Sequence, residues 1–488
     1  MYLGIDIGTS AVKAVLVDGS GNVVGQQIAP LTVSRPRPLW SEQDPDAWWQ
    51  AANAAVGALD ATGRRAVRAI GLSGQMHGAT LLDSKDRPLR PAILWNDGRS
   101  GEECRELEAL VPRSRQITGN LAMPGFTAPK LLWVRRHEPE VFSRIASVLL
   151  PKDYVRLCMT GERATDASDA AGTLWVDVAR RAWSPEMLDA CGLDERHMPR
   201  LYEGSQATGT LRPQVAEAWG MKQVPVAAGA GDNAAGAIGV GVIEAGSALL
   251  SLGTSGVLFL ADDRFRSNPE RAVHAFCHCL PDRWHLMSVI LSAASCIDWV
   301  ARIAGCSGAG EALRLAESRN RPSRSEIFLP YLSGERTPHN EPHAQGVFFG
   351  LTHETDAAAL VQAVLEGVAF ALADGLDALR GTGAQLKAVS VIGGGARSRY
   401  WGRILASALE LPLEYREGGE VGPAFGAARL GRLAHSGEAP ESVCVAPALR
   451  DVIEPEPELV SLYARRRALF GDLYRRLHTA FAEKQDES

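Results

Sequence analysis

Two short segments carry a Gly-Thr-Ser triplet that could bind a phosphate group. The first is Asp6-Ile-Gly-Thr-Ser10, in which a carboxylate precedes Gly8, Thr9 and Ser10. Glycine lets the backbone approach an oxygen-rich ligand, and turn N–H groups with hydroxyls bind phosphate oxygens. A carboxylate beside phosphates recruits magnesium, often through water. Taken alone, the segment is equally compatible with a plain hairpin turn.

The second triplet, Gly253-Thr254-Ser255, lies in the other half of the chain, directly after Leu252. Two such turns facing each other would grip one polyphosphate from both sides, which favours the functional interpretation of both. Lys13 follows the first triplet and is a candidate for a positive charge beside the phosphates. The alternative for Lys13 is a lysine on the face of a strand.

An acidic residue follows an apolar run in the motif Gly231-Asp232-Asn233. A carboxylate at the end of a strand is well placed to take a proton from a substrate hydroxyl. Helix capping by Asp232 is the common alternative. The neighbouring phosphate-binding turns favour the catalytic role.

Three glycines, Gly393, Gly394 and Gly395, precede Ala396 at a predicted strand-to-helix turn. Such a turn leaves room for a flat ligand, or for a phosphate near a helix N-terminus. The pattern is neither the Gly-x-Gly-x-x-Gly fingerprint nor a P-loop, so a nicotinamide cofactor is not supported. ATP would have to be held by the other motifs.

The elements around these motifs predict an α/β protein. Segments 2–10, 11–17 and 23–28 read as an antiparallel meander, and 248–261 repeats part of that pattern. Elsewhere strands alternate with helices, among them a long helix capped by Asp356 and a C-terminal helix within 455–488. The repeat predicts two lobes with a cleft between them, residues 1–245 and residues 246–488.

Composition excludes several classes of protein. The chain has 488 residues, 46% hydrophobic and 22% charged, with a net charge of −6, which does not suit a nucleic-acid-coating protein. Its eight cysteines are scattered, as is typical of reduced thiols in the cytosol. One cluster, His274, Cys277, His278 and Cys279, raises a metal hypothesis, although paired zinc-ligand spacing is missing.

No stretch of the sequence predicts a membrane span. The longest uncharged segment, 245–261, is short and is interrupted by glycines. No basic and then apolar leader precedes the first strand. We therefore expect a cytoplasmic protein with no membrane partner.

Together these motifs resemble the FGGY family of carbohydrate kinases, within the actin-like ATPase superfamily. Two further segments are similar to family signatures, Phe126–Trp133 and Gly346–Leu351. The resemblance extends to about residue 435. It implies an α/β fold of two actin-like (ribonuclease H-like) lobes, each a mixed sheet flanked by helices, with an interlobe cleft.

The resemblance also implies roles for the motifs. Asp232 would be the catalytic base, and Asp6 would act with it and hold Mg²⁺, with both carboxylates binding the metal through water. ATP would be the co-substrate. Its binding residues would be Gly8, Thr9, Ser10, Lys13, Gly253, Thr254, Ser255, Gly393, Gly394, Gly395 and Ala396.

Within the family, the segment Ser73–Thr80 is similar to the sugar-binding loop of the bacterial kinases that act on D-xylulose. Four more segments fit that subgroup: 94–99, 150–154, 168–172 and 332–338. By this resemblance Met76, His77, Asp232 and Asn233 bind the sugar, and the product is D-xylulose 5-phosphate. A homodimer is common in the family.

Two alternatives remain open, and a third is disfavoured because too few residues precede Asp6 to form the extra domain that it would need. The sugar could be ribulose, glycerol or gluconate, because a few side chains can change the substrate. A non-catalytic actin-like nucleotide-binding protein is a second alternative, although it would not need the sugar loop. A sugar-responsive repressor is the third, and it would carry a basic helix-turn-helix ahead of the first strand.

Overall fold

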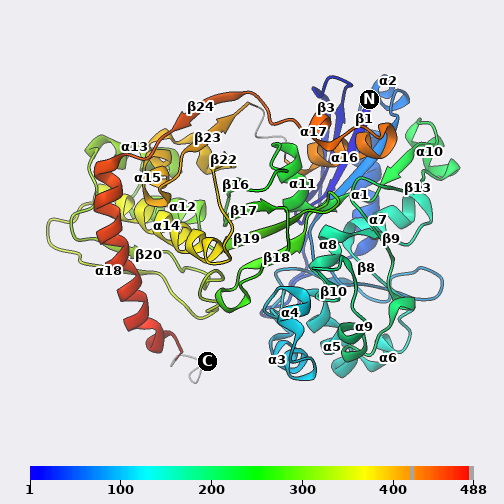
Figure 1. Ribbon diagram of the computed structural model, residues 1–488, viewed down its shortest axis with the longest axis horizontal. Helices are drawn as coiled ribbons and strands as arrows, with labels where there is room; N and C mark the ends of the chain where they lie inside the picture. The colour runs from blue at the N-terminus through cyan, green and yellow to red at the C-terminus, as the bar shows by residue number, and fades with distance from the viewer. Residues whose placement is uncertain (418–421, 483–488) are drawn as a thin grey trace.

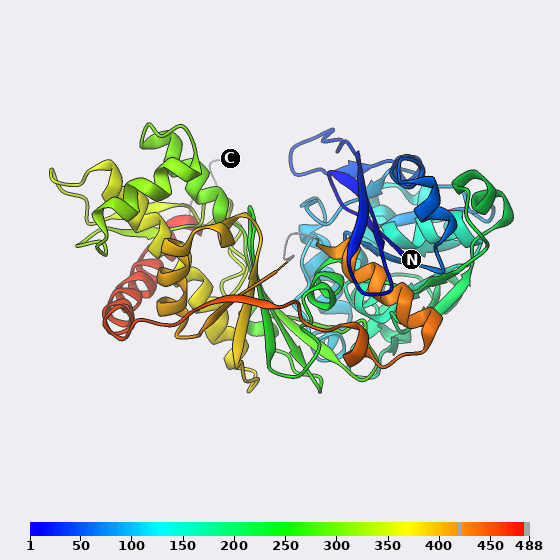
Figure 2. The ribbon, with the colours of Figure 1, turned by 90° about the horizontal axis from the view of Figure 1, so that it is seen from above.

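The computed structural model describes residues 1–417 and 422–482. The chain forms two lobes joined by a narrower waist, with the N-terminus in one lobe and the C-terminal helix in the other (Figure 1 and Figure 2). Each lobe contains a seven-stranded sheet of mixed direction. The predicted α/β class and two-lobed architecture are confirmed.

The first sheet has strands from the N-terminal half of the chain. Strand β1 pairs antiparallel with β2 and parallel with β5, and β2 pairs antiparallel with β3, as the meander predicted. The strands in spatial order are β13 (Ala207–Thr210), β14 (Pro225–Ala227), β5 (Ala69–Gly74), β1 (Tyr2–Ile7), β2 (Ala11–Val17) and β3 (Val23–Pro30), with β15 (Ala230–Gly231) also beside β5.

The second sheet repeats this plan. Strand β16 pairs antiparallel with the next strand, β17, and parallel with the later strand β22. The strands in spatial order are β18 (His274–Cys277), β19 (Trp284–Ile290), β17 (Gly256–Asp262), β16 (Ser247–Leu252), β22 (Ala388–Ile392), β23 (Leu413–Arg416) and β24 (Leu449–Ile453). The repeated pattern of the sequence therefore corresponds to two related sheets.

Helices cover both sheets. Asp44 caps the first helix of the chain. Asp356 caps the long central helix of the second lobe by accepting a hydrogen bond from Ala359 N at 2.8 Å. The N-terminal half contributes α1 (Pro45–Gly57), α2 (Ala61–Arg65), α3 (Gly101–Leu110), α4 (Ser114–Thr118), α5 (Thr127–His137), α6 (Pro139–Phe142), α7 (Pro151–Thr160), α8 (Ala167–Ala171), α9 (Pro185–Ala190), α10 (Pro213–Trp219) and α11 (Asp232–Gly239). The C-terminal half contributes α12 (Ala294–Ile303), α13 (Ala309–Arg319), α14 (Ala357–Arg380), α15 (Arg399–Leu409), α16 (Pro423–Ser436), α17 (Pro440–Val443) and α18 (Pro457–Ala482).

Helix α16 belongs to the second half of the sequence but packs on the first sheet, against β1, β5 and α11. The packing is close enough to require glycine, since a Cβ at Gly426 would lie 1.8 Å from Ala235 O on α11. Helix α11 begins at Asp232, so α16 fixes the helix that carries this residue. The lobe boundary between residues 245 and 246 stays a prediction. Helix α16 does not follow it, because it lies after residue 246 in the sequence but packs on the first sheet.

Helix α14 is long and apolar enough to cross a membrane by length and composition, but 83% of its most apolar window is buried inside the protein. It is the core helix of the second lobe. All eight cysteines are free, as the scattered spacing predicted. The predicted C-terminal helix is α18, whose expected continuation over 483–488 lies outside the described residues.

Candidate active site

Two carboxylates lie near the C-terminal end of strand β5, one on either side of it. Strand β1 pairs Ile7 with Gly74 of β5, and β15 pairs Gly231 with that same residue from the other side. Asp6 and Asp232 are the neighbours of these paired residues in the chain. Residues far apart in the sequence thus meet because their strands share one neighbour.

Each carboxylate is held by hydrogen bonds to one of its oxygens. Ser73 Oγ donates to Asp6 Oδ1 at 2.8 Å. Asn233 donates to Asp232 Oδ1 twice, from its backbone N at 2.7 Å and from Nδ2 at 2.8 Å. These bonds orient both side chains and leave Oδ2 of Asp232 for another partner.

The environment of the two carboxylates favours their protonated forms. Burial raises the pKa of Asp232, and the nearby charge of Asp6 raises it further, to about 7. Burial also raises the pKa of Asp6 to about 6, against the opposing effects of the Ser73 hydrogen bond and of Lys13. Lys13 lies directly opposite Asp6 on β2. A carboxyl with a pKa near 7 is suited to take and release protons at neutral pH.

The predicted sugar loop packs against Gly231, the residue before Asp232. The side chain of Met76 is buried and fills the space in front of Gly231, where an added Cβ would lie 2.9 Å from Met76 Sδ. His77 follows with a φ of +69°, a left-handed conformation that is uncommon for a residue with a side chain. Its carbonyl oxygen accepts from Lys130 Nζ at 2.8 Å and from Thr127 Oγ1 at 3.1 Å, and these two bonds hold the loop in place.

The His77 ring is neutral and held in one tautomer. Burial and the nearby Lys130 charge lower its pKa to about 3. Its Nδ1 lies 2.7 Å from Gly172 O, and a carbonyl can only accept, so Nδ1 carries the proton. Nε2 is therefore an acceptor, which suits a hydroxyl of a bound ligand. The ring edge also packs against Phe126, with centroids 4.8 Å apart.

The first Gly-Thr-Ser turn joins β1 to β2 and belongs to a network of side chains that the sequence analysis did not identify. Thr9 Oγ1 donates to Gln75 Oε1 at 2.9 Å and accepts from Trp95 Nε1 at 3.0 Å. Gln43 Nε2 donates to Thr9 O at 2.7 Å. The Thr9 hydroxyl thus holds the turn in place, while Ser10 is exposed and Gly8 is half-buried, with its N–H donating to Ala11 O at 3.1 Å. Gln75 is itself a residue of the predicted sugar loop, and its place in that motif was the signal available in the sequence.

The second turn lies between β16 and β17, beside the triple glycine. Strand β22 pairs Ile392 with Ser251, so Gly393 follows alongside Leu252 with a φ of +93°. No atom lies within 4 Å of where a Cβ at Gly394 would be, so this part of the turn is open. The motif Gly253-Thr254-Ser255 and the glycines are therefore neighbours in space.

The two Gly-Thr-Ser turns belong to different sheets, and their binding of one polyphosphate stays a prediction. The metal hypothesis for the cluster around Cys277 is not supported. Within residues 1–417 and 422–482, no group of three or more His, Cys, Asp or Glu side chains could hold a metal ion. His278 and its neighbours are instead buried, close to the stacked rings of Phe259 and His285, whose centroids are 4.3 Å apart.

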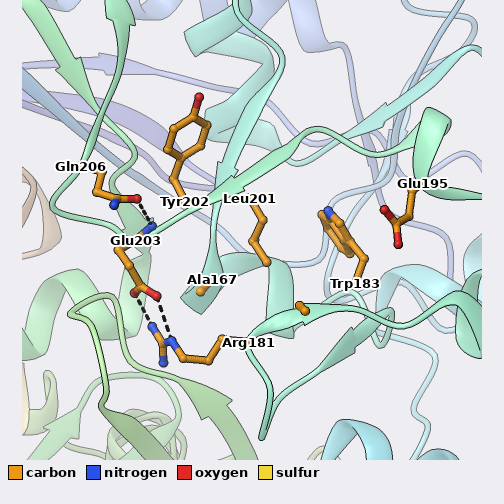
Figure 3. A pocket seen from close by; sticks show the side chains of 9 residues that line it. Ala167, Arg181, Trp183, Glu195, Leu201, Tyr202, Glu203 and Gln206 are labelled. Carbon is orange, nitrogen blue, oxygen red and sulfur yellow. Dashed lines mark hydrogen bonds and ion pairs between the residues drawn. The ribbon is translucent and has the colours of Figure 1, made fainter.

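A separate hollow of about 320 Å³ lies away from these motifs (Figure 3). None of the predicted site residues lines it. One of its lining residues, Arg181, forms an ion pair with Glu203 (Figure 3). The lining residues are Ala167, Arg181, Ala182, Trp183, Glu195, Leu201, Tyr202, Glu203 and Gln206.

Comparison with known families assigns both halves of the chain. Residues 1–239 match the N-terminal domain of the FGGY family of carbohydrate kinases, and residues 248–435 match its C-terminal domain. Together these matches cover most of the chain and contain every motif described above.

Individual relatives are similar over nearly their whole length. The chain is 58% identical over 482 residues to the xylulose kinase of Escherichia coli K12, covering 98% of this chain and 99% of the relative. It is 56% identical to the xylulose kinase of Klebsiella pneumoniae, with the same coverage. Among solved structures, a xyloylose kinase from Brucella ovis superposes with a TM-score of 0.95 at 52% identity, covering 98% of this chain and 99% of that one.

Proposed function

The chain belongs to the FGGY family of carbohydrate kinases, and from this premise we infer that it transfers the γ-phosphoryl group of ATP to D-xylulose. The observation that carries the inference is the pair of carboxylates on either side of β5, with Met76 packed against Gly231, the residue before Asp232. Sugar choice follows the near-full-length identity to xylulose kinases.

Asp232 is the proposed general base. Its free oxygen takes the proton of the sugar C5 hydroxyl while Asn233 holds the other oxygen. The C5 oxygen attacks the γ-phosphorus in line, the bond to the β-phosphate oxygen breaks, and D-xylulose 5-phosphate and ADP leave. His77 Nε2 accepts a hydroxyl of the same sugar, and Met76 closes the apolar side of the pocket.

Mg²⁺ fits between these groups. Burial raises the pKa of both Asp6 and Asp232, the Asp6 charge raises the pKa of Asp232 further, and a divalent cation would stabilise the ionised form of both carboxylates. Two carboxylates leave most ligand positions to water and phosphate oxygens, which is how magnesium is commonly held. When bound, the ion neutralises charge on the β- and γ-phosphates.

The remaining predicted residues would hold the nucleotide. In this proposal the turn Gly8-Thr9-Ser10 and Lys13 face the phosphates from the first lobe, and Gly253-Thr254-Ser255 faces them from the second. Gly393 to Ala396 would form the adenosine site, because the open space at Gly394 admits a flat base. We further propose a cytoplasmic homodimer, as is common among such kinases.

A substrate panel tests the function directly. We expect ADP release, followed with coupling enzymes, to be fastest by kcat/KM with D-xylulose among xylulose, ribulose, glycerol and gluconate. A higher value with another sugar would keep the chemistry and change the substrate. ATP binding without sugar-dependent ADP release on any of the four would instead favour an actin-like nucleotide-binding protein.

The activity is expected to depend on pH through Asp232. The base works only when deprotonated, so kcat/KM for xylulose should fall as the pH drops through about 7. A pH–rate profile from pH 5 to 9, with saturating ATP, measures this fall, the acidic limb of the profile. A flat profile between pH 5 and 8 would contradict the assignment of the base.

Gly172→Ala is expected to weaken sugar binding. The added methyl group would lie 2.5 Å from His77 Nδ1 and 3.0 Å from Met76 Cε, so the sugar loop must shift. Overpacking of this kind costs about 1–3 kcal/mol, which corresponds to roughly a 10- to 100-fold rise in KM for xylulose. KM for ATP should stay within about twofold of the wild-type value, since the nucleotide motifs are not touched.

The matched control for this variant is Gly101→Ala, because a methyl group at Gly101 would meet no atom within 4 Å. Both variants should give folded protein, since Gly172 already has a φ of −73° that alanine adopts readily. Equal effects on the two Michaelis constants in Gly172→Ala would argue against a sugar site at His77.

A further inference from the structure

A group of charged side chains lies fully buried beneath the active site and takes no part in the proposed chemistry. Lys152 Nζ lies 2.7 Å from Asp153 Oδ1, 2.9 Å from Asp166 Oδ1 and 3.2 Å from Asp169 Oδ2. All four side chains are inaccessible to solvent. Burial of such a cluster is costly, so its presence calls for a role other than stability alone.

The cluster reaches the chain that leads to Asp232 through Arg156. Arg156 pairs with Asp153 at 3.2 Å and donates to Ala227 O at 2.6 Å and to Ala228 O. These carbonyl groups belong to the last residue of β14 and the residue after it, four and three residues before Gly231. The base strand β15 is thus tied to the cluster from its N-terminal side.

A second connection runs through helix α8, which Asp166 caps. Asp166 Oδ2 accepts from Ser168 N at 2.8 Å and from Ser168 Oγ. Ser168 Oγ in turn accepts from Gly231 N at 3.2 Å. This chain of hydrogen bonds ends one residue before Asp232. The Ser168 hydroxyl is polarised because it donates to the Asp166 carboxylate.

The other end of α8 holds the sugar loop. The carbonyl oxygen of Gly172, at the C-terminal end of the helix, accepts a hydrogen bond from His77 Nδ1 at 2.7 Å. Residues 168 and 172 are one helical turn apart. One short helix, anchored by Lys152 through Asp166, therefore contacts both the base strand and the sugar-binding histidine.

We propose that Ser168 is a positioning residue for Asp232, and that α8 sets the spacing between the base and the sugar site. The inference rests on the proposed function, because it assigns Ser168 a task in that reaction. Burial, the Asp6 charge and Asn233 set the pKa of Asp232. Ser168 therefore acts on the position of the base and not on its acidity.

Ser168→Ala tests the proposal. The Gly231 N–H loses its acceptor, and small displacements of a catalytic group cost up to ~100-fold in rate, so we expect kcat to fall by roughly 10- to 100-fold. KM for xylulose should change less than about threefold, because Gly172 still holds His77. The acidic limb of the pH–rate profile should stay in place. A purely structural role would not give this split between kcat and KM.

Amide hydrogen exchange gives a readout that does not depend on activity. We expect the Gly231 amide to be protected in the wild-type protein and to exchange faster in Ser168→Ala. Fast exchange at Gly231 in the wild-type protein would show that Ser168 does not hold it. That result would overturn the proposal whether or not the variant folds.

Ser184→Ala is the matched control. Ser184 is also a buried serine whose hydroxyl accepts from a backbone N–H, that of Met187 at 3.4 Å, but it caps α9, which carries none of the predicted site residues. Its kcat should be that of the wild type. If Ser168→Ala keeps kcat within twofold of the wild type, the inference fails while the proposed function stands. A wild-type protein inactive on all four sugars would instead contradict the proposed function.

Discussion

Asp232→Ala is expected to lower kcat for xylulose phosphorylation by about 10²–10⁴-fold, the usual contribution of a general base. The carboxylate is the proposed proton acceptor, and Asn233 holds it in position through two hydrogen bonds. ATP affinity should survive, since the phosphate-binding turns are untouched. Single-turnover kinetics and calorimetric titration with MgATP measure the two effects separately. Near-normal turnover would remove Asp232 from the mechanism.

The raised pKa of Asp232 also predicts how the neutral variant Asp232→Asn changes stability. The folded-state pKa of Asp232 is raised from 3.8 to about 7, so its stabilising contribution is present below about pH 4 and is lost as the pH rises through 7. At pH 8 the ionised side chain therefore destabilises the protein. Asp232→Asn should consequently have a Tm at pH 8 no lower than that of the wild type.

Asp60→Ala serves as the control for losing an aspartate at the start of a helix. Asp60 caps α2 by accepting from Gly63 N at 2.8 Å, and it belongs to none of the site motifs. The variant should lose about 1 kcal/mol of stability and keep its kcat.

Asp6→Ala is expected to lower kcat by about 10²–10³-fold, the size of effect seen when one group that stabilises transition-state charge is removed. The loss follows from the proposed place of Asp6 beside the phosphates, with Lys13 opposite and Ser73 donating to it. Raising the Mg²⁺ concentration should recover part of the activity. Turnover within about threefold of the wild type would contradict a role at the phosphates.

The same variant makes an independent prediction about acidity. The charge of Asp6 raises the pKa of Asp232, so its removal should move the acidic limb of the pH–rate profile below pH 7. The control is Asp18→Ala. Asp18 lies in the turn between β2 and β3, where its side chain accepts hydrogen bonds from the backbone N–H groups of Ser20 and Asn22. That variant should leave both turnover and the limb unchanged.

Much of the local structure was predictable because local signals specify it. The cap at Asp44, the cap at Asp356 and the glycine turns of the meander all act within a few residues, and each forms the expected element. The chemistry-bearing motifs were recognisable for the same reason. A carboxylate followed by small residues is a contiguous pattern, visible in Asp6-Ile-Gly-Thr-Ser10 and in Gly231-Asp232-Asn233.

Other parts of the site depend on partners distant in the sequence. The Thr9 network draws on Gln43, Gln75 and Trp95. Gln75 lies in the predicted sugar loop, but nothing in the sequence marks these three residues as joint partners of one turn. The packing of α16 on the first sheet, through Gly426, also crosses the boundary that sequence repetition predicted.

The sequence by itself determined the two-lobed α/β class, the motifs and the kind of chemistry they support, because periodicity, capping and turn preferences are short-range. Only the tertiary structure decided that Asp6 and Asp232 flank one strand, and that Ser168 and Gly172 join the base strand to the sugar loop. Strand order and the burial of Lys152 among three carboxylates are properties of the packed chain. They arise from long-range pairing and desolvation, which no local pattern encodes.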